Sequence, residues 1–160
     1  MKQITTKAPA RKPPPHPRAA AATVTEIMRP PLTTAAQYDH VAAAAYLMKH
    51  AGTTALLVTD AQTGQPAGII TQADIARALA NGKDLNDTRV HAVTITRPAV
   101  TATTSIRDAA TIMTAGHLRH LPVAGAAGLL GVIDITEVCR ALSTAAAGAQ
   151  AASKEGDISH

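Results

Sequence analysis

The stretch GIITQADIARAL, from Gly68 to Leu79, recurs in altered form as GVIDITEVCRAL, from Gly131 to Leu142. Each copy reads as a short apolar strand, a polar turn and a helix that ends in Arg-Ala-Leu. The stretches upstream, Tyr46–Val58 and Thr111–Val123, also align. Self-similarity over this length indicates an internal structural repeat, so the chain is expected to fold as two related units.

Each unit has the same expected order of elements, βαββα. Apolar residues spaced i, i+3, i+4, i+7 predict the first helix of each unit, and Gly52 and Gly116 are expected to end these helices. The expected strands are Pro31–Thr34, Ala55–Thr59 and Pro66–Ile70, then Ala99–Ala102, His120–Val123 and Leu129–Ile133, and the expected helices include His40–His50 and Ile106–Ala115. The fold class is therefore α/β, of the α+β type.

Composition restricts the classes of function. The 160 residues are 46% hydrophobic, but they include no Phe or Trp and only two Tyr, so the core must be aliphatic. Modules for single-stranded nucleic acid need aromatic stacking platforms, which this chain lacks. No apolar run approaches the roughly 18–20 residues of a membrane span. The one cysteine, Cys139, excludes an internal disulfide, and we expect a cytoplasmic protein.

The two ends of the chain differ from the repeats. Residues 1–22 carry five Lys and Arg and no acid; since the net charge is +4, the remainder carries about −1. Three consecutive prolines favour polyproline II, which predicts a disordered or semi-rigid arm. Such an arm would give only weak, salt-sensitive binding to nucleic acid, which is not the expected partner. Residues 144–160, Ala-rich and then polar, predict a flexible tail after an extension of the last helix.

Three motifs give the repeats a family resemblance: EIMRP (Glu26–Pro30), RHLPV (Arg119–Val123) and GIITQAD (Gly68–Asp74). The chain resembles a tandem pair of CBS (cystathionine-β-synthase) domains, also called a Bateman module, with repeats at 23–83 and 84–143. The resemblance implies two βαββα units packed as a pseudo-twofold pair with a cleft between them, and a homodimer of such pairs. It also implies an adenosine-containing ligand (AMP, ADP, ATP or S-adenosylmethionine), no required cofactor, and regulation of a partner protein rather than catalysis.

Thr71 and Asp74 are the leading candidates for ligand contacts. Thr71 lies where strand gives way to helix, where free N–H groups favour an anion. By resemblance, Thr71 would lie near a phosphate and the Asp74 carboxylate would accept hydrogen bonds from the ribose hydroxyls. The competing interpretation is a helix capping box, which Ser105 and Asp108 repeat at another helix. We expect Asp74→Ala to abolish ligand binding while costing at most about 1 kcal/mol of helix stability, as for a lost cap partner.

The second copy replaces these residues with Asp134 and Glu137. Both remain good capping residues. However, a carboxylate at position 134 would stand where a phosphate should approach, and like charges repel. We therefore expect one adenosyl site per chain, with the second cleft empty, altered or used for an uncharged adenosine moiety.

The resemblance implies further contacts. Arg119 and His120 would reach the phosphates bound at the opposite unit, and Thr33 and Thr34 would lie beside the base. The segment that holds Thr33 and Thr34 is longer than its counterpart in the second unit. With no Phe or Trp available, the adenine is expected between aliphatic groups; the candidates are Leu56 and Ile70.

A metal site and a cysteine nucleophile are not expected. His117 and His120 have no cysteine or carboxylate close by in sequence to complete a metal site, and none is expected. Cys139 is interpreted as a small packing residue. The preferred function is a stand-alone CBS-pair sensor whose ligand changes its conformation or partner binding; the alternative is a ligand-free dimerisation or protein-interaction module. No enzyme activity is expected.

Overall fold

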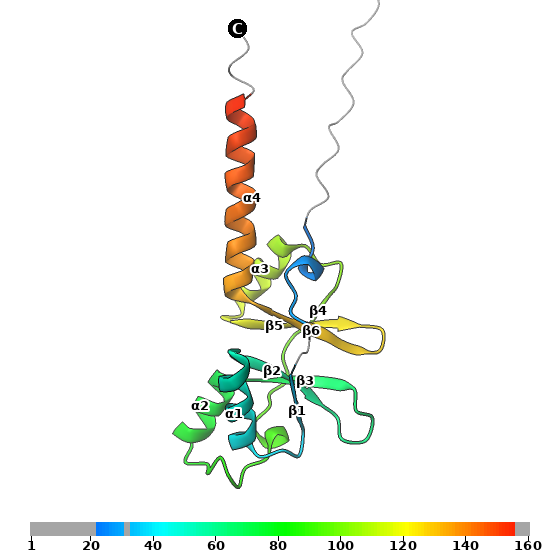
Figure 1. The fold of residues 1–160 in the computed structure, drawn as a ribbon, viewed down its shortest axis with the longest axis vertical. Coiled ribbons are helices and arrows are strands. Elements are labelled where there is room, and N and C mark those ends of the chain that lie inside the picture. The colour runs from blue at the N-terminus through cyan, green and yellow to red at the C-terminus, as the bar shows by residue number, and fades with distance from the viewer. Residues whose placement is uncertain (1–21, 31–32, 156–160) are drawn as a thin grey trace, which may run out of the picture.

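The computed structural model of the chain describes residues 22–30 and 33–155 (Figure 1). The first repeat contains β1 (Thr34–Ala36), α1 (Val41–Ala51), β2 (Ala55–Thr59), β3 (Pro66–Thr71) and α2 (Gln72–Ala80). The second contains β4 (Val100–Thr101), α3 (Ile106–Ala115), β5 (His120–Gly125), β6 (Gly128–Asp134) and α4 (Ile135–Glu155). The expected order βαββα is confirmed in both repeats.

The two repeats share one sheet topology. Each forms a three-stranded sheet, ordered β1-β2-β3 and β4-β5-β6. In each sheet the first pair of strands is parallel and the second antiparallel. The register shifts at corresponding points, between Val58 and Thr59 in β2 and between Val123 and Ala124 in β5. The sequence repeat therefore encodes a structural repeat that extends to this irregularity.

Each repeat has its own aliphatic core, formed where its first helix packs on its sheet. The buried positions of α1 are Val41, Ala44 and Met48, and those of α3 are Ile106, Ala109 and Met113. These positions follow the spacing of three to four residues that places side chains on one helix face. Gly52 ends α1 with a left-handed backbone (φ 62°), which a glycine adopts without steric cost.

The segment that precedes each repeat completes the core of the other repeat. Val24, in a 3-10 turn (Val24–Glu26), is fully buried in the core of the second repeat, and its N–H donates to the carbonyl of Thr104. Val90, in a second 3-10 turn (Val90–Ala92), is fully buried in the core of the first. This exchange ties the two repeats together.

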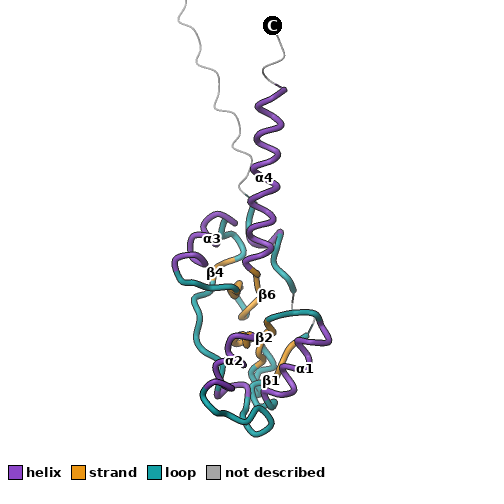
Figure 2. Tube along the Cα trace, turned by 90° about the vertical axis from the view of Figure 1, so that its left-hand side faces the viewer, coloured by secondary structure: helices purple, strands orange, loops and turns teal. Residues whose placement is uncertain are grey.

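The sheets of the two repeats face each other, with the helices outside. Figures 1 and 2 show α1 and α2 beyond one sheet and α3 and α4 beyond the other, and β3 contacts β6 between them. At the junction, the side chains of Thr54 and His120 are hydrogen-bonded, with Oγ1 and Nε2 2.7 Å apart. Thr54 immediately precedes the central strand β2, and His120 is the first residue of the central strand β5.

Some boundaries differ from expectation. The first strand, expected at Pro31–Thr34, begins at Thr34, because residues 34–36 align with Leu57–Thr59 of β2; residues 31–32 lie outside the described residues. The last helix continues to Glu155, so most of the predicted tail is helical. The basic arm, apart from Ala22, and residues 156–160 lie outside the described residues. No helix in the described part of the chain is long and apolar enough to cross a membrane.

Candidate functional site

The start of α2 is built around Thr71 and Asp74. Thr71 has extended backbone angles and is the N-cap of the helix. Its hydroxyl accepts a hydrogen bond from the N–H of Asp74 (3.3 Å), and the Asp74 carboxylate accepts from the N–H of Thr71 (2.9 Å). The Thr71 hydroxyl also lies 2.9 Å from Asp74 Oδ2. The capping box expected from the sequence is therefore present.

Asp74 has a second role, as one partner of a buried ion pair. Its side chain is 0% exposed and that of Arg97 is 8% exposed. Nη2 of Arg97 lies 2.6 Å from Oδ1 and 2.7 Å from Oδ2, and Arg77 donates a further bond to Oδ1 (3.1 Å). Burial raises the pKa of Asp74, but the hydrogen bonds from Arg97 and Thr71 outweigh it and leave the pKa below its usual value. The carboxylate is therefore ionised and fully hydrogen-bonded.

Arg97 was not expected to have a role, although a repeated dipeptide in the sequence could have pointed to it. Arg97 belongs to an Arg-Pro pair that precedes the first strand of the second repeat, and Arg29 belongs to an Arg-Pro pair at the matching place before the first. In the structure, Arg29 donates a 2.7 Å hydrogen bond to Glu137. Each Arg-Pro pair thus supplies a cation to the acidic residue that begins the last helix of the other repeat.

A cavity of about 540 Å³ opens beside Thr71 and is strongly basic. Its lining includes three arginines and no carboxylate among the described residues. The arginines are Arg77, Arg97 and Arg119. The first residues of α2 also line it, so the N-terminus of this helix lies at its edge, although the N–H of Gln72 already donates to the carbonyl of Thr54 and that of Asp74 to the Thr71 hydroxyl. We call this space the basic cavity; its charge favours an anion.

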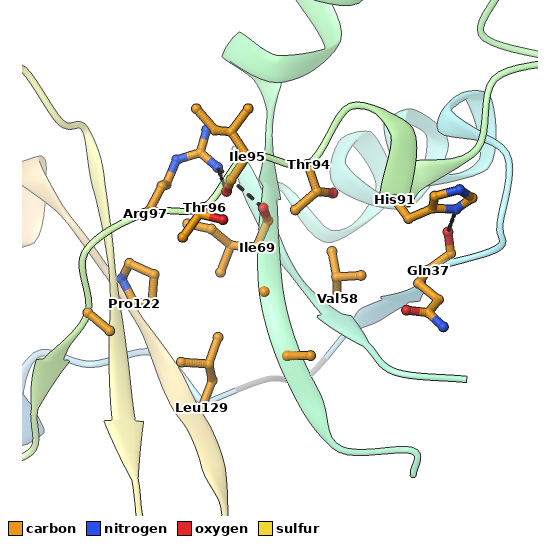
Figure 3. Close-up of a pocket in the computed structure, with 13 residues that line it drawn as sticks. Gln37, Val58, Ile69, His91, Thr94, Ile95, Thr96, Arg97, Pro122 and Leu129 are labelled. Atoms are coloured by element: carbon orange, nitrogen blue, oxygen red, sulfur yellow. Dashed lines mark hydrogen bonds between the residues drawn. The ribbon is translucent and has the colours of Figure 1, made fainter. Parts of the chain in front are cut away.

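A second cavity, of about 270 Å³, is also lined by Arg97 (Figure 3). Ile69 of β3 and Pro122 of β5 form apolar parts of its wall, and Thr94 and Ile95 of the segment between the repeats form another. Figure 3 shows Arg97 at the edge of this space, where its Nη1 reaches the carbonyls of Ile69 and Ile95, both at 3.4 Å. We call this space the linker cavity. Arg97 lines both cavities, and together they form the first cleft.

The second cleft has the same plan but a different charge. Glu137 is paired with Arg29 and Arg140. The cavity beside it is smaller, about 200 Å³, and its lining includes the carboxylates of Asp134 and Glu137 as well as the two arginines. Arg29 also lines a neighbouring cavity of about 350 Å³. Because the carboxylates offset the arginines, the second cleft lacks the charge excess of the basic cavity.

His120 lies between the two clefts and lines the cavities on both sides of the junction. Its Nε2 is 3.1 Å from Oδ2 of Asp134 and 2.7 Å from Oγ1 of Thr54. Burial lowers the pKa of His120 below its usual value, although the Asp134 carboxylate opposes this shift. The imidazole is therefore neutral at pH 7.

The structure brings together only part of the set of predicted ligand contacts. Thr71, Arg119 and His120 line the basic cavity, and Asp74 lies directly behind Thr71. Thr33 lines a cavity of the second cleft instead. Thr34 is an exposed residue of β1 and lines none of the cavities described above.

The two aliphatic candidates for the adenine, Leu56 and Ile70, are cross-strand partners that point into the helix-covered core of the first repeat. Leu56 also borders a cavity of the second cleft. The preceding residue of β3, Ile69, faces the linker cavity, because successive strand residues point to opposite faces. Ile69 therefore lines the first cleft, whereas Ile70 lies in the core of the first repeat.

Cys139 was expected to pack inside the last helix, and His117 and His120 were not expected to bind a metal. The interpretation of Cys139 as a packing residue is wrong: it is exposed, and its neighbour Val138 occupies the core. Among residues 22–30 and 33–155, no three His, Cys, Asp or Glu side chains are grouped so that they could hold a metal ion.

Fold and clefts define a protein of two βαββα repeats that face each other across paired, charge-bearing cavities. The model of the CBS domain matches residues 24–81 and 90–144. The chain therefore belongs to the CBS-domain family, as its resemblance indicated.

The chain is similar to the following three proteins. A 17.7 kDa protein from the bps2 3′ region of Acidianus ambivalens is 36% identical over 103 residues, which cover 64% of this chain and 62% of that protein. A CBS-domain-containing protein from Agrobacterium tumefaciens superimposes with a TM-score of 0.68 at 26% identity, covering 78% of this chain and 96% of the other. A CBS-domain protein from Pyrobaculum aerophilum complexed with AMP has a TM-score of 0.66 at 22% identity, covering 73% and 90%.

Proposed function

We propose that this CBS-pair protein is a regulatory module that binds an adenosine-containing ligand in the first cleft. The observation that carries the proposal is the ion pair of Asp74 and Arg97: Arg97 lines both a partly apolar cavity and a basic one, and the Asp74 carboxylate that it contacts is buried directly behind this lining. A nucleotide has a flat apolar base, a ribose diol and a phosphate in that order. The linker cavity, Asp74 and the basic cavity offer matching chemistry in the same order.

The AMP in the Pyrobaculum aerophilum protein supports this choice of ligand class. In the role proposed here, the ligand connects residues of both repeats, since Thr71 belongs to the first and Arg119 to the second. A ligand shifts a conformational equilibrium only by its differential affinity for the two states. The relative position of the repeats is the property that such a ligand would fix, and a partner protein or a second copy of the chain would respond to it.

A second candidate function is a ligand-free interaction module. The observation that favours it is the full set of hydrogen bonds on Asp74, which the chain supplies by itself through Arg97, Arg77 and Thr71. In this case the residues of the first cleft would only stabilise the fold.

Thermal unfolding with AMP, ADP, ATP, GTP and S-adenosylmethionine separates the two functions. A ligand present at 100 times its dissociation constant should stabilise the protein by about 2.7 kcal/mol, which gives a clear rise in Tm. We expect a rise with adenosyl ligands that is lost in Asp74→Asn, each protein being compared with its own ligand-free Tm. The matched control is Asp108→Asn, because Asp108 has the same spacing from its N-cap but lies exposed on α3. If no ligand raises the Tm, the interaction module is the better explanation.

A further inference from the structure

Arg97 occupies the place where a ribose would have to bind. It lines both the linker cavity and the basic cavity, and its guanidinium contacts both oxygens of Asp74. Its side chain is nearly as buried as that of Asp74 itself. Arg97, together with Ile95, therefore forms the boundary between the two halves of the first cleft, beside the acidic residue.

The carboxylate of Asp74 has no acceptor site to spare. A carboxylate offers about four lone-pair sites. Arg97 contacts both oxygens, Arg77 contacts Oδ1, and the N–H and hydroxyl of Thr71 both contact Oδ2. A ribose diol can bind Asp74 only if it replaces bonds that the chain already makes, and the bonds from Arg97 are those that stand between the cavities.

Replacing Arg97 with a diol changes the local charge. The diol is neutral, so the guanidinium that leaves Asp74 loses its counter-ion inside a largely buried site, which is costly. The described residues that line the basic cavity offer no carboxylate in exchange, and Arg77 and Arg119 are already there. The missing negative charge must therefore come with the ligand.

We propose that Arg97 restricts the first cleft to anionic adenosine ligands. The ion pair of Arg97 and Asp74 opens only for a ligand that brings a phosphate to the basic cavity. This inference rests on the proposed function and narrows it to AMP, ADP and ATP. Adenosine lacks the compensating charge, and S-adenosylmethionine has a net positive charge, because its sulfonium and its ammonium group together outweigh its single carboxylate. Arg97 is thus a specificity residue that first competes with the ribose and then contacts the phosphate.

Calorimetric titration of the full chain with AMP, adenosine and S-adenosylmethionine tests the proposal. The wild-type protein should bind AMP roughly 10- to 100-fold more tightly than adenosine, the effect of one strong charge-assisted contact. S-adenosylmethionine should bind more weakly than adenosine. Arg97→Gln should bind adenosine more tightly than the wild type, because no guanidinium has to be displaced. The ratio of the AMP and adenosine affinities should fall at least about threefold, although Arg77 and Arg119 still favour a phosphate.

The matched control is Arg29→Gln, because Arg29 has the same place before the other repeat but serves the second cleft and is 59% exposed. It should leave both affinities unchanged. If Arg97→Gln weakens the binding of AMP and of adenosine equally, so that the ratio of the two affinities is unchanged, the proposal is wrong although the proposed function stands. If the variant does not fold, equal affinities of the wild type for AMP and adenosine overturn the proposal in the same way. If the wild type binds none of the three, the proposed function and this inference both fail.

Discussion

Asp74 combines two stabilising roles in one side chain. As the N3 residue of α2 it closes a capping box with Thr71, and as a buried carboxylate it neutralises Arg97. The two roles differ greatly in energy, because a cap contributes about 1 kcal/mol. Removing one member of a buried ion pair leaves the other charge without compensation and costs about 3–5 kcal/mol. The ion pair therefore decides what a substitution of Asp74 does to stability.

We predict that Asp74→Ala lowers the free energy of unfolding by about 3–5 kcal/mol, since it leaves Arg97 buried and unpaired. Asp108→Ala, at the corresponding capping position of α3, should cost only about 1 kcal/mol, because Asp108 is exposed and forms no ion pair in the described part of the chain. Urea denaturation of both variants checks this. Equal losses would show that the Asp74–Arg97 pair contributes little.

The sequence could predict the cap but not the ion pair. Thr71 and Asp74 are three residues apart, and that spacing is itself the signature of a capping box. Arg97 is 23 residues from Asp74, and Arg29 is 108 residues from Glu137. Such distant contacts leave no local periodic pattern. Only the repetition of Arg-Pro before each repeat gave a sign of them, and it acquires meaning once the repeats are placed face to face.

At the scale of elements, the fold depends on chain segments that lie outside the regular strands and helices. The order of the strands and helices could be predicted because apolar spacing and helix-ending glycines are local signals. The segments around Val24 and Arg29 have no such signal, yet one completes a core and the other crosses β6. The sequence does not determine on which face of a strand or helix a residue lies, as Ile70 and Cys139 show, because neighbouring residues differ in burial by their orientation alone.

Residues 28–29 cross β6 so closely that position 131 requires a glycine. Arg29 and Val132 exchange backbone hydrogen bonds at 3.0 and 3.3 Å. A Cβ on Gly131 would lie 2.5 Å from the carbonyl oxygen of Arg29 and 2.6 Å from Cγ of Met28. We predict that Gly131→Ala lowers the free energy of unfolding by about 1–3 kcal/mol, because backbone has to move.

Gly148→Ala is the control for this prediction, because nothing lies within 4 Å of the added methyl group in the outer part of α4. It should leave the stability unchanged or raise it by at most about 1 kcal/mol, as alanine is the better helix former. Chemical denaturation of both variants provides the measurement. A neutral Gly131→Ala would mean that the segment 28–29 is free to move away from β6.

Across the whole molecule, the two repeats match in their backbone arrangement but differ in the charge of their clefts. Both clefts have an Arg-Pro cation, an acidic residue at the start of a helix and cavities on either side. The first contains a 540 Å³ cavity lined by three arginines, whereas the second contains a 200 Å³ cavity lined by two arginines and two carboxylates. A shared fold thus gives two chemically different clefts, and Asp134 is the residue that most changes the second.

This asymmetry predicts one ligand per chain. Calorimetric titration with the tightest-binding adenine nucleotide should give a stoichiometry of one, because a phosphate at the second cleft would meet the ionised carboxylate of Asp134. Burial raises the pKa of Asp134, but the hydrogen bonds from Thr136 outweigh it, so the pKa stays below its usual value and the charge persists at neutral pH. Glu137→Gln, a change confined to the second cleft, should leave the stoichiometry and the affinity as they are. A stoichiometry of two would show that a phosphate is accepted beside Asp134, and that charge does not decide which cleft is used.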